Sequence, residues 1–243
     1  MKFHIYLQAR VNSQRLPKKI LKKINGKTIF EILVKRLELI SNSEIFLITG
    51  SSLLNNELIN EAKKLNITYF SGDENNILNR FFNASKKFSS ENIIRITGDC
   101  PLIDFELIND AIKLFNQKNI DLLLNYIPRT YPHGFDFEIF TAKALNNSRN
   151  QIFSQFNDKD LFLSTFINPV KHMINSKDIV QYKLKSNTNN SHIRLTMDYE
   201  DDLRLISSIY QKLHKNNPNF NSSDILNLLK LEPNLLDINK SFI

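Results

Sequence analysis

Basic and hydroxyl side chains gather directly after the first apolar run of the chain. The run Phe3 to Leu7 predicts a strand, and the next residues, 9–21, read A-R-V-N-S-Q-R-L-P-K-K-I-L. The side chains of this segment that can hold an anion are Arg10, Ser13, Arg15, Lys18 and Lys19. Arginine offers a planar fork to phosphate oxygens and lysine a point charge, and ligands of open α/β sheets lie beyond the carboxyl ends of the strands. The segment therefore predicts a phosphate-binding loop, the alternative being a solvated basic loop without a ligand.

Two aspartates follow two later apolar runs. Asp99 comes after the run 92–97 and Asp198 after the run 193–197, so both stand at the ends of expected strands. Mg²⁺ is usually held by one or two carboxylates together with substrate phosphates, and both aspartates would face the basic loop. The pair therefore predicts a metal–nucleotide site. The alternative is that both are turn formers or helix caps, since a helix beginning at Tyr199 needs a cap.

These side chains need a sheet to bring them together, and the chain up to residue 125 alternates between strand-like and helix-like runs. Strands are expected at 3–7, 44–49, 67–70, 92–97 and 120–124, and helices at 28–40, 57–65, about 77–88 and 104–118. Thr28, Asp73 and Asp104 are expected to cap three of these helices. Such an alternation predicts an α/β fold with a doubly wound, mostly parallel sheet.

The pattern changes between residues 126 and 190. This part combines a loop rich in Tyr, Pro, His and Gly, a strand near 136–140, helical stretches from residue 141 and a polar segment at 187–191. We interpret it as a return to the sheet with an excursion that serves as a lid or a dimer arm. A last strand at 193–197 and helices at 199–214 and 223–230 follow. We find no internal repeat and no linker, so residues 1–243 are expected to form a single domain.

Composition limits the classes of function. The 243 residues carry a net charge of +7, but the basic residues are mostly mixed with acidic ones and do not alternate with aromatic residues, so no stable nucleic acid partner is expected. We find no apolar run of 18 residues and no signal peptide, and Cys100 is the single cysteine, so we expect a cytoplasmic protein without membrane insertion. A dinucleotide-binding fingerprint, a P-loop and a zinc-like spacing of histidines are absent from the sequence.

Four stretches resemble one family. The pattern A-R-x-x-S-x-R-L-P-x-K-x-L resembles the signature of the sugar cytidylyltransferases, and most closely that of the spore coat polysaccharide biosynthesis protein F-like branch. The other three are R-I-T-G-D-C-P-L-I-D at 95–104, I-R-L-T-M-D-Y-E-D-D-L at 193–203, and Y-P-H-G-F-D-F-E at 131–138. The segment 71–73 with Arg80 is similar to a further family region, so the resemblance covers most of residues 3–210. Two departures are Lys18, where the family usually has glycine, and K-D-L-F-L at 159–163, where it often has R-E-H-V-T.

The resemblance implies a nucleotide-diphospho-sugar transferase (Rossmann-like) fold and a reaction that transfers CMP from CTP to a sugar and releases pyrophosphate. It implies catalytic roles for Arg10, Arg15, Lys19 and Asp99, and Mg²⁺ on Asp99 and Asp198. The nucleotide-binding residues would be Ala9, Arg10, Ser13, Arg15, Lys19, Gly72, Asp73, Arg80 and Thr97. The sugar pocket would be lined by Tyr131, His133, Gly134, Asp136 and Glu138. Relatives are often dimers, so a homodimer is expected.

Two other functions stay open at this point. A glycosyltransferase of the same superfamily would use an NDP-sugar donor and would have no need for a triphosphate-sized basic loop. A non-catalytic nucleotide- or RNA-binding module is favoured only by the basic pI near 9.3. Release of pyrophosphate separates the first from a nucleotidyltransferase, and salt-dependent RNA binding without turnover would indicate the second. The sugar, the base, the group that activates the acceptor and the oligomeric state are left open by the sequence.

Overall fold

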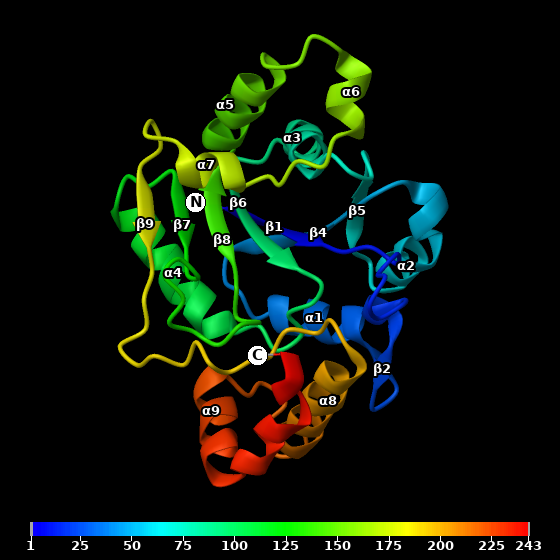
Figure 1. Cartoon of the computed structure of the whole chain (residues 1–243), viewed down its shortest axis with the longest axis vertical. Coiled ribbons are helices and arrows are strands. Elements are labelled where there is room, and N and C mark those ends of the chain that lie inside the picture. The colour runs from blue at the N-terminus through cyan, green and yellow to red at the C-terminus, as the bar shows by residue number, and fades with distance from the viewer. Residues whose placement is uncertain (1, 243) are drawn as a thin grey trace.

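One sheet organises the molecule. The computed structural model describes residues 2–242, and in it seven strands are ordered β5–β4–β1–β6–β8–β7–β9 (Figure 1). The strands are β1 Phe3–Gln8, β4 Ser43–Thr49, β5 Thr68–Ser71, β6 Asn92–Thr97, β7 Leu122–Leu124, β8 Glu138–Thr141 and β9 Gln181–Lys183. Every neighbouring pair is parallel except those that involve β8. The predicted fold class, an α/β fold with a mostly parallel sheet, is confirmed.

Helices cover both faces of the sheet (Figure 1). They are α1 Ile29–Leu37, α2 Ser52–Lys64, α3 Ile77–Lys87, α4 Phe105–Gln117, α5 Ala142–Phe153, α6 Lys159–Ser164, α7 Lys171–Asn175, α8 Glu200–His214 and α9 Ser222–Leu231, with short 3₁₀ turns η1 Lys19–Leu21, η2 Pro233–Ile238 and η3 Lys240–Phe242. One hydrophobic core joins the sheet to α1, α2, α4, α8 and α9, and the other joins it to α3, α5 and α7. Because side chains alternate along a strand, Ile5 and Leu7 enter the first core and Tyr6 the second. None of the helices among residues 2–242 combines the length and apolar character needed to cross a bilayer.

Helix caps decide where several of these helices begin. Thr28 accepts a hydrogen bond from the backbone N–H of Glu31, and Asp104 caps α4, as predicted. The prediction that Asp73 caps α3 is wrong. The cap is Asn76, whose side chain accepts from the N–H of Asn79, because the helix begins at Ile77, four residues after Asp73. The helix expected at 57–65 begins earlier, at Ser52.

A tight hairpin follows the basic loop. Strands β2 Lys23–Ile24 and β3 Lys27–Thr28 pair with each other outside the main sheet. Asn25 and Gly26 between them have φ angles of 50° and 80°, as a two-residue hairpin turn requires.

The strand expected at 193–197 does not form. The segment is extended, but it makes only an isolated bridge, between Arg194 and His133. Leu195 N–H donates to the carbonyl of His133 at 2.6 Å and Met197 N–H to that of Asp99 at 2.8 Å. The apolar residues here bury into a core while the backbone pairs with loops, which gives a strand-like sequence without a neighbouring strand. This path brings Asp198 to the edge of the sheet where Asp99 lies.

Candidate active site

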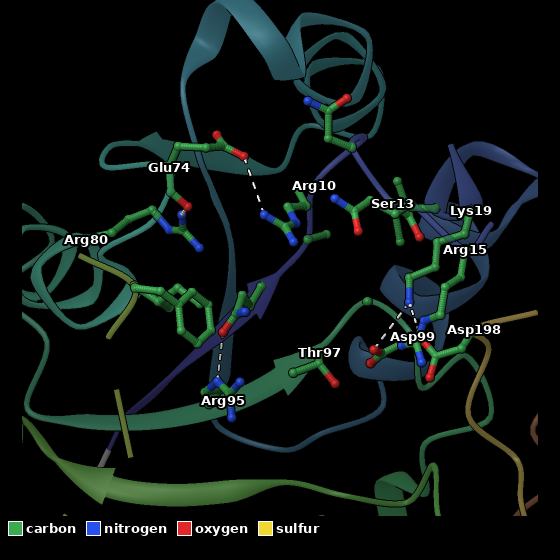
Figure 2. A pocket seen from close by; sticks show the side chains of 18 residues that line it. Arg10, Ser13, Arg15, Lys19, Glu74, Arg80, Arg95, Thr97, Asp99 and Asp198 are labelled. Carbon is green, nitrogen blue, oxygen red and sulfur yellow. Dashed lines mark hydrogen bonds and ion pairs between the residues drawn. The ribbon is translucent and has the colours of Figure 1, made fainter. Parts of the chain in front are cut away.

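A pocket of about 490 Å³ lies beyond the carboxyl ends of β1 and β6. It contains nine of the residues predicted for the nucleotide and the metal: Ala9, Arg10, Ser13, Arg15, Lys19, Arg80, Thr97, Asp99 and Asp198. Figure 2 shows the side chains converging from the basic loop, from β6 and from the segment before α8. The predicted residues Gly72, Asp73, Tyr131, His133, Gly134, Asp136 and Glu138 are not among those that line it.

The basic loop is held by its own backbone and by α2. Val11 N–H donates to the side-chain carbonyl of Asn55 at 2.9 Å, and Ile20 is almost fully buried. Lys18 adopts a left-handed conformation with φ 53°, and its ammonium bonds the exposed carboxylate of Glu57. Glycine adopts this conformation without a Cβ penalty, which accounts for the glycine usual at this position in the family. The loop thus directs Lys18 away from the pocket and Lys19 into it.

Lys19 joins the two predicted carboxylates. Its ammonium lies 3.3 Å from Oδ2 of Asp99 and 3.1 Å from Oδ1 of Asp198, and it also donates to the carbonyl of Met197. Burial acts to raise the pKa of Asp99, but the Lys19 charge and hydrogen bonds, including one from Thr97, outweigh it and hold that pKa below its ordinary value of 3.8. Asp99 is therefore ionised at neutral pH. The Lys19 ammonium thus neutralises part of the negative charge of Asp99 and Asp198.

Asp198 is held in place by two arginines. Arg15 reaches its Oδ1 at 2.8 Å and Arg194 its Oδ2 at 3.2 Å. Arg194 is fixed in turn by the fully buried Asp202, which accepts two bonds from its guanidinium at 3.0 and 2.9 Å. Asp202 also accepts from the backbone N–H groups of Asp198 and Tyr199, so it starts α8 without a cap from Asp198. The sequence prediction missed Arg194 and Asp202, although both lie in the motif at 193–203.

The opposite end of the pocket is built by the segment before α3. The carboxylate of Glu74 lies 3.8 Å from Arg10 and accepts from the N–H of Ser51, so it ties the basic loop to the end of β4. Arg80 is buried and donates to the carbonyl of Asp73 at 2.6 Å and to that of Glu74 at 3.3 Å. Burial lowers the pKa of Arg80 to about 10, so it is still charged at neutral pH. Glu74 was not predicted from the sequence.

Gly72 and Asp73 support this end from behind. A Cβ on Gly72 would lie 2.8 Å from the ring of Phe70, so a larger residue here would push that ring aside. The Asp73 carboxylate accepts from the side-chain amide of Asn79 at 2.7 Å. Both residues therefore shape the segment that presents Arg80.

A buried ion pair forms the floor. Arg95 on β6 donates to Glu138 on β8 at 2.7 Å and to the side chain of Gln8 at 2.8 Å; the dashed line at Arg95 in Figure 2 marks the bond to Gln8. Glu138 also accepts from the hydroxyl of Tyr126, and burial raises its pKa above the ordinary value in spite of Arg95. Glu138 is therefore connected to the pocket through Arg95. Arg95 lines the pocket, although the sequence prediction did not include it.

The other residues expected in a sugar pocket lie beside Arg194. Gly134 has φ 116°, and a Cβ there would lie 2.4 Å from the carbonyl carbon of Leu195, so only glycine fits. Asp136 forms a two-bond ion pair with Arg129 at 2.6 and 2.8 Å.

His133 connects this group to the carboxylate cluster. Its Nδ1 lies 3.5 Å from a nitrogen of Arg194, and burial lowers its pKa, with Asp136 acting against the shift. Tyr131 is half-buried and packs against the core. Of these residues, His133 is connected to Asp198 through Arg194, and all of them lie outside the lining of the pocket.

The two aspartates fit a hard cation. Among residues 2–242 there is no group of three or more His, Cys, Asp or Glu side chains placed to hold a metal. The oxygens of Asp99 and Asp198 nevertheless lie within 3.3 Å of one ammonium, so a single cation can contact both. Two carboxylates plus phosphate oxygens are the donors that Mg²⁺ commonly takes.

A mostly parallel sheet whose first loop carries cations opposite two carboxylates is the arrangement expected of a nucleotidyltransferase, an α/β enzyme that handles nucleoside phosphates at the carboxyl edge of its strands. The chain belongs to the cytidylyltransferase family, whose model matches residues 5–214.

Curated relatives and solved structures agree with this assignment. The chain is 26% identical over 233 residues to the spore coat polysaccharide biosynthesis protein SpsF of Bacillus subtilis, covering 93% of each chain. It is 30% identical over 171 residues to the 3-deoxy-manno-octulosonate cytidylyltransferase of Fusobacterium nucleatum, covering 70% of this chain and 65% of that one. A cytidylyltransferase from Leptospira borgpetersenii has a similar structure, with a TM-score of 0.83, 26% identity and 97% of each chain covered.

Proposed function

We propose that the protein activates a small sugar by transferring CMP from CTP to it, with release of pyrophosphate, for the synthesis of a surface polysaccharide or glycan. The observation that carries the proposal is a pocket in which the cationic loop faces two carboxylates, Asp99 and Asp198, that are joined by Lys19. The relatives named for spore coat polysaccharide synthesis and for 3-deoxy-manno-octulosonate activation support it.

The basic loop would hold the triphosphate. Arg10 and Arg15 each expose about half of their side chain, and Lys19 is bound only by ionic and carbonyl contacts, so all three can turn toward phosphate oxygens. Ser13 lines the same wall and can donate its hydroxyl. Their positive charges would stabilise the negative charge that develops on the leaving pyrophosphate in an in-line displacement.

Asp99 and Asp198 would hold Mg²⁺. When bound, the ion would neutralise and orient the phosphates. Lys19 lowers the pKa of Asp99, so this carboxylate is ionised at neutral pH, and Arg15 and Arg194 form ion pairs with Asp198. Asp202 fixes Arg194 and thereby the orientation of Asp198.

The acceptor would bind beside these carboxylates. Tyr131, His133, Gly134 and Asp136 would contact it, since His133 is connected to Asp198 through Arg194, and Glu138 would support the site by holding Arg95. We propose that residues 1–243 work as one domain, since the core on one face of the sheet includes residues from Phe3 to Leu235. The segment 126–190 would serve as the lid or the dimer arm of a homodimer.

The test has two parts. A thermal-shift screen of CTP, UTP, ATP and GTP, each with and without Mg²⁺, is expected to show the largest stabilisation for CTP with Mg²⁺. Pyrophosphate release is then measured with CTP and a panel of acceptors that includes 3-deoxy-manno-octulosonate, N-acetylneuraminate and sugar phosphates. Arg15→Ala should weaken CTP binding with little effect on the melting temperature. Stabilisation by a nucleotide-sugar and by none of the triphosphates would overturn the proposal in favour of a glycosyltransferase.

A further inference from the structure

An exposed aromatic ring stands in the wall of the pocket, whose lining is rich in charged side chains. Phe166 is 66% exposed and lines the pocket, together with Ile77 at the start of α3. It comes from the connection between α6 and α7, within the segment 126–190 that the sequence marks as an excursion. Among the large apolar side chains that are exposed, Phe166 is set apart by its place in the pocket lining, where a ligand could cover its ring.

The chain around Phe166 is fixed on both sides. The side-chain amide of Asn76 donates to the backbone carbonyl of Phe162 at 2.7 Å, and the side-chain amide of Asn75 donates to the backbone carbonyl of Ser164 at 3.3 Å. On the other side, Leu78 N–H donates to the carbonyl of Ile167 at 3.1 Å. The connection is therefore docked on the beginning of α3, and the ring is held at the pocket by hydrogen bonds to that helix.

The buried side chain of Phe162 also holds this connection in place. Its side chain is fully buried and packs edge-on against the rings of Phe153 and Phe156. Phe162 and Phe166 are four residues apart, and Phe162 is fully buried whereas Phe166 is exposed. Phe166 is thus exposed on a segment that is itself held by hydrogen bonds and by the packing of Phe162.

Donors of hydrogen bonds lie at the same end of the pocket. Arg80, on the helix that carries the docked connection, is 3% exposed and lines the pocket. Its Nε is buried without a hydrogen-bond partner in the described part of the chain. Arg95 supplies a second guanidinium in the lining. Figure 2 shows Arg80 and Arg95 on one side of Arg10, and Lys19, Asp99 and Asp198 on the other.

A flat ring with acceptor atoms on its edge matches this end of the pocket. Aromatic side chains stack on nucleobases, while guanidinium groups donate to carbonyl oxygens and ring nitrogens. A triphosphate gains nothing from Phe166 and has cations at the other end. We propose that Phe166 forms the wall against which the nucleobase stacks, so that the excursion supplies a specificity-determining residue to the nucleotide site. This inference rests on the proposed function.

The first test separates the base from the phosphates. Phe166→Leu keeps an apolar side chain but removes the ring, and calorimetry measures its affinity for CTP and for inorganic tripolyphosphate. CTP should bind about 5- to 100-fold more weakly, as expected for the loss of one stacked base, and tripolyphosphate should bind within about twofold of the wild type. Leu161→Ala is the matched control, because Leu161 is 55% exposed on the same excursion and lies outside the pocket lining. It should change neither affinity.

The second test uses the absence of tryptophan from the 243-residue sequence. Phe166→Trp introduces the only indole, and its fluorescence should be quenched by CMP and not by ribose 5-phosphate or pyrophosphate. Leu161→Trp should show no quenching by any of the three. Quenching by CMP that equals quenching by ribose 5-phosphate would assign the ring to the sugar instead of the base and overturn the inference.

Failure of the inference differs from failure of the proposed function. If the wild type binds CTP and Phe166→Leu binds it equally well, Phe166 is not in the base site, although the enzyme assignment stands. A change in the oligomeric mass of Phe166→Leu without a change in CTP affinity would make the ring an interface residue and overturn the inference. Absence of CTP binding by the wild type itself would instead reject the proposed function.

Discussion

The rings of Tyr199 and Phe242 stack with their centroids 4.0 Å apart and their planes at 7° to each other. Phe242 belongs to η3, at the far end of the chain, whereas Tyr199 follows Asp198 in the site. Arg15 lies over the Tyr199 ring, with its guanidinium carbon 5.1 Å from the centroid, and donates to the tyrosine hydroxyl at 3.5 Å. The segment that carries Phe242 thus supports Arg15 of the basic loop through the ring of Tyr199.

This stack predicts that Phe242→Ala weakens the binding of CTP. Stacked aromatic pairs contribute about 0.5–1.5 kcal/mol, so the KM for CTP should rise about 2- to 10-fold while the fold is retained. Steady-state kinetics measure the change. Leu231→Ala is the control, since Leu231 is 82% exposed on α9 and lies outside the pocket lining. Equal KM values for wild type and Phe242→Ala would show that the stack does not position Arg15.

Two adjacent lysines should differ sharply when each is replaced by methionine. Lys19→Met removes the cation that joins Asp99 and Asp198, and loss of one charge-assisted contact to phosphate should lower kcat/KM by about 10- to 100-fold. Lys18→Met removes only an exposed pair with Glu57, which is worth about 0–1 kcal/mol, so activity should stay within about threefold of the wild type. Similar losses in both variants would contradict the inward and outward directions of the two side chains.

The residues that the sequence placed in the nucleotide site share one property. Arg10, Lys19 and Asp99 follow strands β1 and β6, and the meeting of parallel strand ends is a rule of the fold that can be read from an alternating pattern. The same rule predicted the position of Asp198, but the structure brings Asp198 there in a different way. Its segment is not a strand, yet its backbone bonds to the loops of His133 and Asp99 carry it to the same edge.

The partners of these residues could not be read in the same way. Whether Asp202 pairs with Arg194, or Glu138 with Arg95, depends on which side chains are buried together. Burial is a property of the packed fold, and a motif does not say which of its charged side chains form pairs. Asp73 illustrates the limit, because aspartate is a good helix cap but Asn76 stands closer to the start of α3.

Breaking the Arg95–Glu138 pair should cost stability. Both side chains are at most 10% exposed, and removal of one partner from a buried ion pair costs about 3–5 kcal/mol because the other charge is left unpaired. We therefore expect Arg95→Ala to lower the free energy of unfolding by about 3 kcal/mol in urea titrations. The double variant Arg95→Met with Glu138→Leu should recover most of this loss, since apolar replacements leave no unpaired charge.

The same pair gives a separate prediction for activity. Arg95 lines the pocket and is bonded to Gln8, so the double variant should be stable but should bind CTP or acceptor more weakly than the wild type. A double variant that regains both stability and activity would restrict Arg95 to a structural role. One that does not regain stability would show that the pair is needed for the packing of β6 against β8.

Asp99→Asn should separate metal dependence from folding. Asparagine has nearly the shape of aspartate but no charge, and the Asp99 carboxylate is ionised at neutral pH because its pKa is lowered. The variant should therefore fold, retain some affinity for CTP through the basic loop, and lose the extra stabilisation that Mg²⁺ adds to CTP in a thermal-shift assay. Turnover should fall by at least about 100-fold, as for wild type treated with a chelator.

Asp201→Asn is the control, because Asp201 pairs with Arg204 outside the pocket lining and should leave the Mg²⁺ dependence unchanged. If Asp99→Asn keeps the Mg²⁺-dependent stabilisation by CTP, the ion is held elsewhere and Asp99 serves only as the partner of Lys19.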